Sequence, residues 1–483
     1  MSAAEETSQR LVVGFDLDMT LVDPRPGVIA TFAATSQETG IAIDGKVVAA
    51  RLGPSLEVEL AHWVPEDRIA DVAGVYRKHF ATLGVDGTSA LPGAQEALSA
   101  VRELGATPLI VTAKSAPLAQ ATIDRLGLSA GEVIGWRWGP GKGEALAERG
   151  AAIYVGDHTG DMLAARACGA VAVAVTTGHD DERSLREAGA DVVLGSLEAF
   201  PEWLSSYVLD QRLARLDSRL RDLGSVLVAF SGGADSALVL AAAVRALGAD
   251  HVVAATAISP SLPASELAAA RQFAEAFGVR HLTPATDELA REGYRANAGD
   301  RCFFCKAELL DVLSPLAGEL GLAWVATGTN ADDALAGFRP GIRAAAERGA
   351  ATPLLDAGLT KAQVRQASRL WSLPTWDKPA AACLSSRIAY GVEVTASRLA
   401  RVERAETALR AALVDAGLIV CNLRVRDLGD RAVVELDLDL VEAVQARPSL
   451  LAVVTGFDDV GIDPRGFRTG AMNELLADAD RWR

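Results

Sequence analysis

Two segments of this sequence each combine a short apolar run with a polar turn and a helical pattern. Residues 11–20 read LVVGFDLDMT, and residues 225–236 read SVLVAFSGGADS. An apolar run of this length that is followed by a helix is typical of a buried strand in a parallel sheet. Because the two segments open two separate series of strands and helices, we expect two doubly wound, Rossmann-like α/β domains.

The length of the chain allows this division. It has 483 residues, 50% of them hydrophobic, which is enough for two or three cores. We place the first junction in the stretch 194–215, where Pro201 is followed by a charged helix expected over 209–223. The first domain is therefore expected over residues 1–205.

The C-terminal part of the chain has a different pattern, in which one long amphipathic helix is followed by alternating strands. We expect the second α/β domain over residues 206–390 and a small α+β subdomain over residues 391–483. The expected elements of this subdomain are a helix over 398–416, strands over 421–426 and 431–438, and a helix near 440–445.

Composition excludes several classes of function. The net charge of −16 argues against DNA or RNA as the main ligand, because nucleic-acid-binding proteins usually carry a basic face. No run of about 18 apolar residues is free of charge, so we expect no membrane span. The first residues, MSAAEETSQR, do not resemble a signal peptide, and five cysteines are too few for a disulfide scaffold. We therefore expect a cytoplasmic protein.

Two carboxylates, Asp16 and Asp18, follow the strand of the first segment. In an extended strand, residues two apart share one face, so both side chains can approach one Mg²⁺ ion and one phosphoryl group. This pair predicts phosphate chemistry at the carboxyl end of the first sheet.

Further polar residues follow later apolar runs of the same domain. Thr112 ends one run, Lys142 lies in GPGKGEAL, and Asp157 and Asp161 follow another run. The order Asp-x-Asp, Thr, Lys and Gly-Asp-x-x-x-Asp resembles the haloacid-dehalogenase superfamily of phosphatases over about residues 10–200.

This resemblance implies a role for each of these residues. Asp16 is the nucleophile that receives the phosphoryl group, and Asp18 is the general acid and base. Thr112 and Lys142 hold the phosphate oxygens. The residues implied to bind Mg²⁺, which cancels the repulsion between a carboxylate and a phosphate dianion, are Asp16, Asp18, Asp157 and Asp161.

Two other features of this domain follow from the resemblance. Residues from about 23 to 91 form a helical cap over the substrate. Lys114 competes with Lys142 for the phosphate role, but Lys142 precedes the last acidic strand at the superfamily's spacing. A domain that keeps this fold without catalysis is the alternative.

The second segment carries Ser231-Gly232-Gly233-Ala234-Asp235-Ser236 between a strand and a helix. Its glycines let the backbone approach a phosphate, and the amides and hydroxyls of the turn can hold an anion at the helix N-terminus. The Gly-Lys-Ser/Thr of a Walker loop is missing. The turn resembles the PP-loop of ATP pyrophosphatases, which implies ATP binding by Ser231, Gly232, Gly233, Asp235 and Ser236.

Four later segments narrow this family. Together they resemble the LarE family of ATP-dependent sacrificial sulfur transferases, and the resemblance covers about residues 206–475. The segments are RCFFCK at 301–306, TGTNADD at 327–333, PLLDAGLTKAQVR at 353–365 and LPTWDKPAAACLSSRIAYG at 373–391.

This second resemblance implies a chemistry centred on Cys383. ATP adenylates a carboxylate of a pyridinium dicarboxylate mononucleotide, the Cys383 thiolate displaces AMP, and elimination leaves the sulfur on the substrate. The product is the thiocarboxylate precursor of the nickel-pincer cofactor of lactate racemase. The residues implied to contact substrate or phosphate are Lys306, Arg387, Arg424, Arg426 and Glu435. We also expect a homo-oligomer formed through the C-terminal half.

The sequence departs from the family pattern in places. Ile388-Ala389-Tyr390-Gly391 stands where the family usually has Ile-Pro-Tyr-Gly. Ser385 and Ser386 stand where some members carry the extra cysteines of an iron–sulfur cluster, so we do not expect that cluster. Cys302 and Cys305 form a single C-x-x-C, for which a structural pair is favoured over a metal site. A tRNA-thiolating PP-loop enzyme remains the alternative.

Overall fold

The computed structural model describes residues 11–52, 55–335, 340–379, 382–468 and 471–475. The chain divides into two compact units, Met1–Val208 and Leu209–Arg483. Among the described residues, no helix is both long and apolar enough to cross a lipid bilayer.

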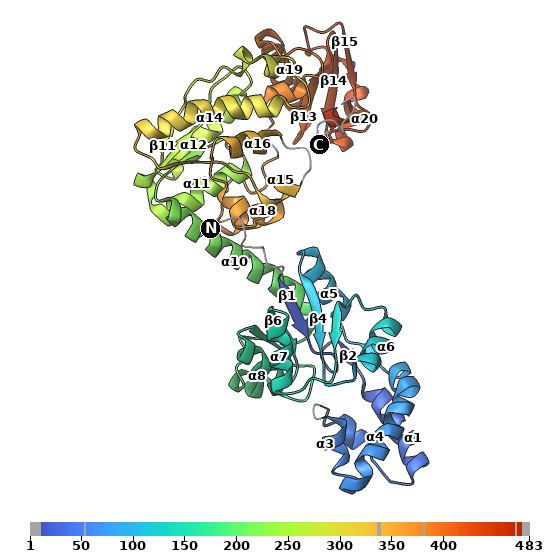
Figure 1. Cartoon of the computed structure of the whole chain (residues 1–483). Helices are drawn as coiled ribbons and strands as arrows, with labels where there is room; N and C mark the ends of the chain where they lie inside the picture. Colours follow the sequence, from blue (N-terminus) through green and yellow to red (C-terminus); the bar gives the residue numbers. More distant parts are fainter. Residues whose placement is uncertain (1–10, 53–54, 336–339, 380–381, 469–470, 476–483) are drawn as a thin grey trace. The chain divides into compact units, whose positions relative to one another are not determined.

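The first unit is built on a six-stranded parallel sheet with the order β5-β4-β1-β6-β7-β8 (Figure 1). Successive residues of a central strand, such as Ile153 and Tyr154, lie in two different apolar clusters, so both faces of the sheet are covered. Helices α5, α6 and the first half of α10 cover one face, and α7, α8 and α9 cover the other. The strands are β1 (Val12–Phe15), β4 (Thr107–Val111), β5 (Glu132–Ile134), β6 (Ala151–Gly156), β7 (Val171–Val175) and β8 (Val192–Leu194). The helices are α5 (Ala94–Glu103), α6 (Ala116–Leu126), α7 (Pro140–Glu148), α8 (Thr159–Cys168), α9 (Glu182–Glu187) and α10 (Phe200–Leu223).

A helical cap is inserted between β1 and β4. It begins and ends at a short antiparallel pair of strands and has its own apolar core, which includes Phe32, Tyr76 and Phe80. Figure 1 shows the cap helices, in blue, grouped together beyond the sheet. The cap elements are β2 (Val22–Asp23), α1 (Arg25–Thr39), α2 (Gly45–Ala49), α3 (Leu56–Leu60), η1 (Glu66–Arg68), α4 (Ile69–His79), the π-helix η2 (Phe80–Gly84) and β3 (Ser89–Ala90).

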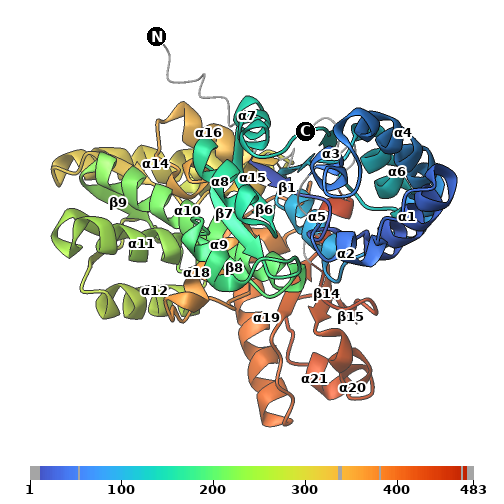
Figure 2. The same ribbon diagram turned by 90° about the horizontal axis from the view of Figure 1, so that it is seen from below.

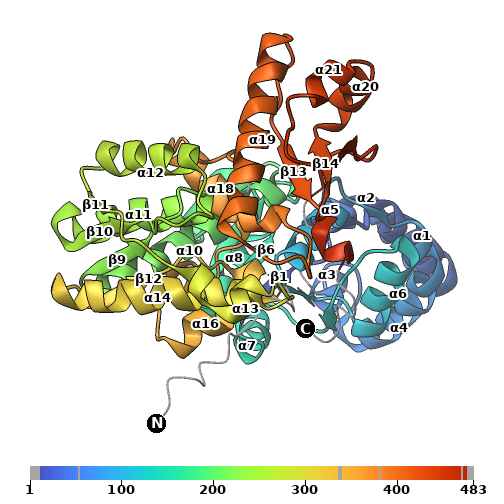
Figure 3. The ribbon, with the colours of Figure 1, turned by 90° about the horizontal axis from the view of Figure 1, so that it is seen from above.

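The second unit contains a four-stranded parallel sheet with the order β11-β10-β9-β12. Figure 3 shows α11 and α12 on one side of β9 and β10 and α14 on the other, in agreement with the two apolar clusters on its faces. The strands are β9 (Val226–Ala229), β10 (Val252–Ala255), β11 (Arg280–Leu282) and β12 (Trp324–Ala326). The main helices are α11 (Ala234–Leu247), α12 (Ala264–Ala276), α14 (Arg301–Glu319), α16 (Pro340–Glu347) and α18 (Lys361–Leu370).

The C-terminal part of this unit forms a three-stranded sheet with its own apolar cluster. Figure 2 shows α20 and α21 close together beside β14 and β15, next to the long helix α19. The elements are α19 (Ala396–Asp415), β13 (Leu423–Asp427), β14 (Arg431–Leu436), α20 (Val441–Gln445), α21 (Pro448–Leu451) and β15 (Asp459–Ile462). The short helices of the chain not yet given are η3 (Leu197–Ala199), η4 (Ala249–His251), η5 (Glu288–Ala290), α13 (Glu292–Arg295), α15 (Ala331–Leu335), α17 (Pro353–Asp356), η6 (Leu384–Arg387), η7 (Leu438–Leu440) and η8 (Ala471–Leu475).

One sequence expectation is wrong in its extent. The helix expected over 209–223 begins nine residues earlier, at Phe200, and so includes Pro201. A proline is tolerated in the first turn of a helix because the first backbone amides have no partner within the helix. Pro201 therefore lies in the first turn of the helix within which the two units meet in the sequence.

Candidate active sites

The first site lies where three neighbouring strands end. Asp16 follows β1, Thr112 follows β4 and Asp157 follows β6, and these three strands are adjacent in the sheet. The carboxyl ends of parallel strands share one edge, so side chains far apart in sequence meet there. All six residues predicted for this site line a single cavity of about 360 Å³, together with Trp138 and His158 from the surrounding loops.

A buried lysine links two of the carboxylates. The Lys142 ammonium lies 2.9 Å from Asp16 Oδ1 and 2.6 Å from Asp161 Oδ1. Burial alone would lower the pKa of Lys142, but Asp16 and Asp161 raise it well above its usual value. Lys142 is therefore a fixed positive charge beside the carboxylate that would act as nucleophile.

The arrangement of acids fits a divalent cation. Asp16, Asp157 and Asp161 each offer an oxygen, and these three atoms lie within 4.8 Å of one another. Burial raises the pKa of Asp16 to about 7, an effect that Lys142 opposes and Asp161 strengthens. Burial likewise raises the pKa of Asp157 well above its usual value. Asp16 Oδ1 is buried, and although it lies in ion-pair distance of Lys142 it accepts no hydrogen bond of regular geometry, so this oxygen is available as a ligand of Mg²⁺.

The fourth predicted ligand, Asp18, lies differently. Its carboxylate accepts a hydrogen bond of 2.7 Å from the ammonium of Lys114. The two lysines that compete for the phosphate role therefore have separate partners. Lys142 is paired with Asp16 and Asp161, and Lys114 is paired with Asp18. A contact between residues 96 positions apart has no signal in the sequence pattern.

The second site surrounds the turn between β9 and α11. Gly232 has φ +71°, in the left-handed region that favours glycine, and the first residue of α11 follows Gly233. Ser231 and Ser236 lie 3.1 Å apart through their hydroxyls across this turn. The turn lines a cavity of about 330 Å³ together with Thr256, Lys306 and Thr329. Because α11 has no side-chain N-cap, its first amides are available to an anion.

Charged residues from distant segments hold this turn in place. Asp235 is ion-paired with Lys361 and accepts a hydrogen bond of 3.2 Å from Asn330. Lys378 donates to the Gly232 carbonyl at 2.9 Å and to Glu266 at 2.7 Å. Asn330, Lys361 and Lys378 lie in the segments quoted above for the family resemblance, but the sequence pattern alone predicts no role for them. Burial lowers the pKa of Lys306, which lines the same cavity.

Cys383 lies just before the short helix η6 and is partly buried. Its sulfur is 2.8 Å from the Ser385 hydroxyl. The next amide, of Leu384, donates to the Ser261 carbonyl at 2.9 Å, and the residue after Ser261, Leu262, lines the PP-loop cavity. These contacts bring the Cys383 segment beside the predicted ATP site.

Two arginines support the backbone around Cys383. Arg387 donates to the Cys383 carbonyl at 2.9 Å and is ion-paired with Glu406 at 2.9 Å. Arg301 donates to the Ser385 carbonyl at 2.9 Å. In this arrangement the guanidinium of Arg387 fixes the loop that presents the thiol.

The predicted phosphate-binding residues of β13 and β14 lie next to η6. Arg426 is ion-paired with Glu435 at 2.6 Å and donates to the Ser386 carbonyl at 3.1 Å. Burial, followed by repulsion from Arg387, lowers the pKa of Arg424 to about 10. A half-buried arginine that lies near other arginines is a favourable place for a phosphate or a carboxylate.

The C-x-x-C pair lies close to the same thiol. Burial raises the pKa of Cys305, and Cys383 is the next largest cause of this rise. Among the described residues, the only group of three or more potential ligands placed closely enough to share a metal ion is that of the acids of the first site.

Comparisons with known proteins agree with this division of the chain. The model of the haloacid dehalogenase-like hydrolase family matches residues 13–132, and that of the asparagine synthase family matches residues 210–412. Hexitol phosphatase A of Escherichia coli is 33% identical over 198 residues, which is 38% of this chain and 90% of that protein.

Relatives of the second unit are more similar. An uncharacterized protein of Synechocystis is 42% identical over 274 residues, which is 56% of this chain and 99% of that protein. Pyridinium-3,5-bisthiocarboxylic acid mononucleotide synthase of Lactiplantibacillus plantarum, a LarE protein, is 34% identical over 274 residues, 56% of this chain and 97% of that protein. The chain belongs to the LarE family, with an added haloacid dehalogenase-like hydrolase unit.

With both units, this chain is an enzyme that has two separate sites. The LarE unit combines a PP-loop with a thiol-bearing loop, and the hydrolase unit combines strand-end carboxylates with a buried lysine. Each site is assembled from residues of its own unit.

Proposed function

We propose that the second unit is an ATP-dependent sulfur transferase that uses Cys383 as sulfur donor. The observation that carries this proposal is the position of Cys383. Its loop hydrogen-bonds to the residue before Leu262, which lines the PP-loop cavity, and two arginines fix the loop. A thiol beside a nucleotide cavity is suited to attack on an adenylate formed there.

The proposed reaction proceeds in three steps. A substrate carboxylate attacks the α-phosphorus of ATP, which gives an acyl-adenylate and releases pyrophosphate to the PP-loop. The thiolate of Cys383 then attacks the acyl carbon and releases AMP, which forms a thioester. Finally a base removes the Cα proton of Cys383 as its Cβ–S bond breaks, so the sulfur leaves with the substrate as a thiocarboxylate and dehydroalanine remains.

The proposed substrate is a pyridinium dicarboxylate mononucleotide, because the name of the Lactiplantibacillus relative gives the corresponding bisthiocarboxylic acid mononucleotide as the compound that it synthesises. Its phosphate would lie near Arg424 and Arg426, with Glu435 orienting Arg426. The product would be the thiocarboxylate precursor of the nickel-pincer cofactor of lactate racemase.

Intact-protein mass spectrometry tests this proposal. After incubation with ATP, Mg²⁺ and the pyridinium dicarboxylate mononucleotide, the chain should lose the mass of one H₂S, and peptide mapping should place the loss at Cys383. An unchanged protein mass together with a thiocarboxylate product would show that the sulfur comes from elsewhere.

We also propose that the first unit is a Mg²⁺-dependent phosphomonoesterase. Asp16 would attack the phosphorus, Asp18 would protonate the leaving oxygen, and Thr112 and Lys142 would hold the phosphoryl oxygens. Asp16, Asp157 and Asp161 would hold Mg²⁺, which lowers the repulsion between the Asp16 carboxylate and the phosphate.

The substrate proposed for this unit is a small phosphorylated metabolite, because a cap suits a small molecule better than a protein. A shared chain also raises the effective concentration of one unit near the other. This favours a metabolite of the same cofactor pathway as the sulfur-transfer reaction. A turnover screen over AMP, pyrophosphate, pyridinium mononucleotides and common sugar phosphates tests this. Preference for an unrelated sugar phosphate would contradict it.

A further inference from the structure

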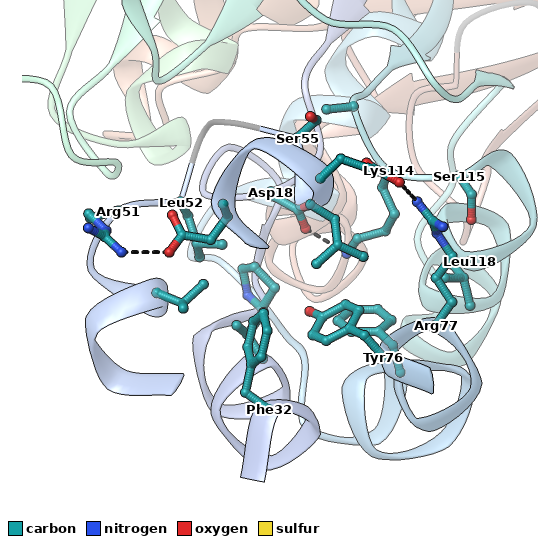
Figure 4. Close-up of a pocket in the computed structure, with 18 of the residues that line it drawn as sticks. Asp18, Phe32, Arg51, Leu52, Ser55, Tyr76, Arg77, Lys114, Ser115 and Leu118 are labelled. Atoms are coloured by element: carbon teal, nitrogen blue, oxygen red, sulfur yellow. Dashed lines mark hydrogen bonds and ion pairs between the residues drawn. The ribbon is translucent and has the colours of Figure 1, made fainter. Parts of the chain in front are cut away.

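A second cavity of the first unit opens beside the catalytic one. It has a volume of about 140 Å³ and lies between the cap and the loops that follow β4 and β5 (Figure 4). Asp18, Leu52, Ser55 and Ala113 line both this cavity and the catalytic cavity. The smaller cavity therefore begins at the proposed general acid, which is the side from which a leaving group departs.

Four aromatic side chains, together with aliphatic and ion-paired side chains, line this cavity. The Phe32 and Tyr76 rings are 4.5 Å apart, and the Tyr76 and Phe80 rings are 5.6 Å apart. Figure 4 shows Phe32 and Tyr76 side by side on one wall. Aromatic rings pack favourably in offset or tilted pairs, so another ring can add to such a group.

Trp136 also lines this cavity, and its backbone has an unusual conformation. Its φ of +58° is rare for a bulky residue. Its amide donates to the Lys114 carbonyl at 2.9 Å, and the Arg77 guanidinium lies 4.8 Å from its ring centre. The hydrogen bond and the contact with Arg77 place this partly exposed indole against the cap.

The cations of this wall are already neutralised. Figure 4 shows each of them joined to a carboxylate. A leaving group that carries its own carboxylate would find no unpaired cation among these three. The pairs are Arg51 with Glu59, Arg77 with Glu57, and Lys114 with Asp18.

The size of the cavity sets the size of the ligand. Apolar cavities of about 150 Å³ bind one benzene molecule. A space of about 140 Å³ with aromatic walls therefore suits a single six-membered ring better than a polyol, whose hydroxyls would lose hydrogen bonds to water.

We propose that this cavity binds the leaving group of the phosphatase and selects phosphomonoesters of alcohols that carry one uncharged aromatic ring. This inference rests on the proposed phosphatase function of the first unit. It disfavours two of the compounds in the screen above, pyrophosphate and the pyridinium dicarboxylates, because their leaving groups are charged.

The test compares kcat/KM for benzyl phosphate, glycerol 3-phosphate, 2-phosphoglycolate and acetyl phosphate with the full chain and Mg²⁺. We expect benzyl phosphate to exceed glycerol 3-phosphate and 2-phosphoglycolate by about tenfold to a hundredfold, the range for burying one ring. Equal values for benzyl phosphate and glycerol 3-phosphate would overturn the proposal. Acetyl phosphate, whose leaving group is too small to fill the cavity, reports the basal phosphatase activity.

Two variants test the cavity itself. Leu56→Trp should fill it and remove the preference for benzyl phosphate, while acetyl phosphate is still hydrolysed. Glu57→Gln should leave Arg77 without its carboxylate and raise kcat/KM for 2-phosphoglycolate at least severalfold. Glu66→Gln, an exposed acid of the cap outside this cavity, is the matched control. An unchanged substrate preference in both Leu56→Trp and Glu57→Gln would refute the assignment.

A binding measurement separates failure of this inference from failure of the phosphatase proposal. If no phosphate ester is hydrolysed, the phosphatase proposal fails, and calorimetry with benzylphosphonate and methylphosphonate still tests the cavity. Tighter binding of benzylphosphonate that is lost in Leu56→Trp would support the cavity assignment. Equal binding of the two phosphonates would reject it.

Discussion

Gly156→Ala tests whether the close packing at the end of β6 sets the position of the carboxylates that we propose to be catalytic. A Cβ atom at residue 156 would lie 2.4 Å from Asp161 Oδ2 and 2.5 Å from Asp161 Cβ. Ordinary contacts begin at 3.4 Å, so Asp161 or the strand must move by about 1 Å. Such a shift disturbs the 2.6 Å contact between Asp161 and Lys142 and the group of acids proposed to hold Mg²⁺.

The expected loss follows from this displacement. A misplacement of about 1 Å in a catalytic group costs about 10²-fold in rate, and overpacking costs about 1–3 kcal/mol of stability. We therefore expect kcat/KM for acetyl phosphate to fall about a hundredfold. The assay is phosphate release by the full chain with Mg²⁺, and circular dichroism checks that the variant is folded.

Two controls make this result specific. Gly141→Ala lies in α7 beside Lys142, where an added Cβ would meet only Arg137 Cδ at 3.8 Å, so it should keep its phosphatase activity. Sulfur transfer by the second unit should also be unchanged in Gly156→Ala. If the Gly156→Ala variant retained more than about a third of the wild-type kcat/KM, the reasoning about the packing of Asp161 would be refuted.

Four further outcomes are expected. Cys383→Ala should abolish thiocarboxylate formation but keep ATP binding, because the PP-loop is intact. Calorimetry measures the ATP binding and product analysis measures the thiocarboxylate, and a thiocarboxylate product would reject Cys383 as the sulfur donor. Asp16→Asn should remove phosphatase activity and spare sulfur transfer, since the sites are built within separate units; loss of both activities in a folded variant would show that the units are coupled. Removal of divalent cations with EDTA should abolish phosphate release, and Mg²⁺ should restore it; turnover that persists in EDTA would argue against the proposed role of Asp157 and Asp161. Lys378→Met should raise the Kd for ATP at least severalfold, because Lys378 donates to the Gly232 carbonyl; an unchanged Kd would show that the PP-loop does not need this support.

The sequence predicted the parts of the fold that depend on local patterns. The helix expected over 398–416 lies at Ala396–Asp415, and the strand expected over 431–438 lies at Arg431–Leu436. The third strand of this sheet, Asp459–Ile462, was not expected, since only the valine and isoleucine of the segment DVGI mark a strand. Short edge strands depend on pairing with a neighbour more than on their own residues.

The candidate sites were predictable where a motif follows a strand and not where they depend on tertiary contacts. Asp16, Thr112 and Asp157 share one cavity because the ends of adjacent parallel strands must meet. The pairing of Asp18 with Lys114 and the position of Trp136 against the cap depend on how loops and cap pack. No periodicity or spacing in the sequence encodes those contacts.

The helix α10 belongs to the cores of both units, and this limits where the chain can be divided. Its residues Phe200, Leu204 and Val208 are buried in the first unit, and Leu209, Leu216 and Leu220 are buried in the second. A fragment that ends at residue 205 would lose the buried side chain of Val208 from its own core. A partner fragment that starts at residue 200 would instead carry the aromatic and apolar side chains of Phe200 and Leu204 into water and would tend to aggregate. Limited proteolysis of the intact chain should therefore spare this helix, and separately expressed halves should be most soluble when the gene is divided between codons 208 and 209.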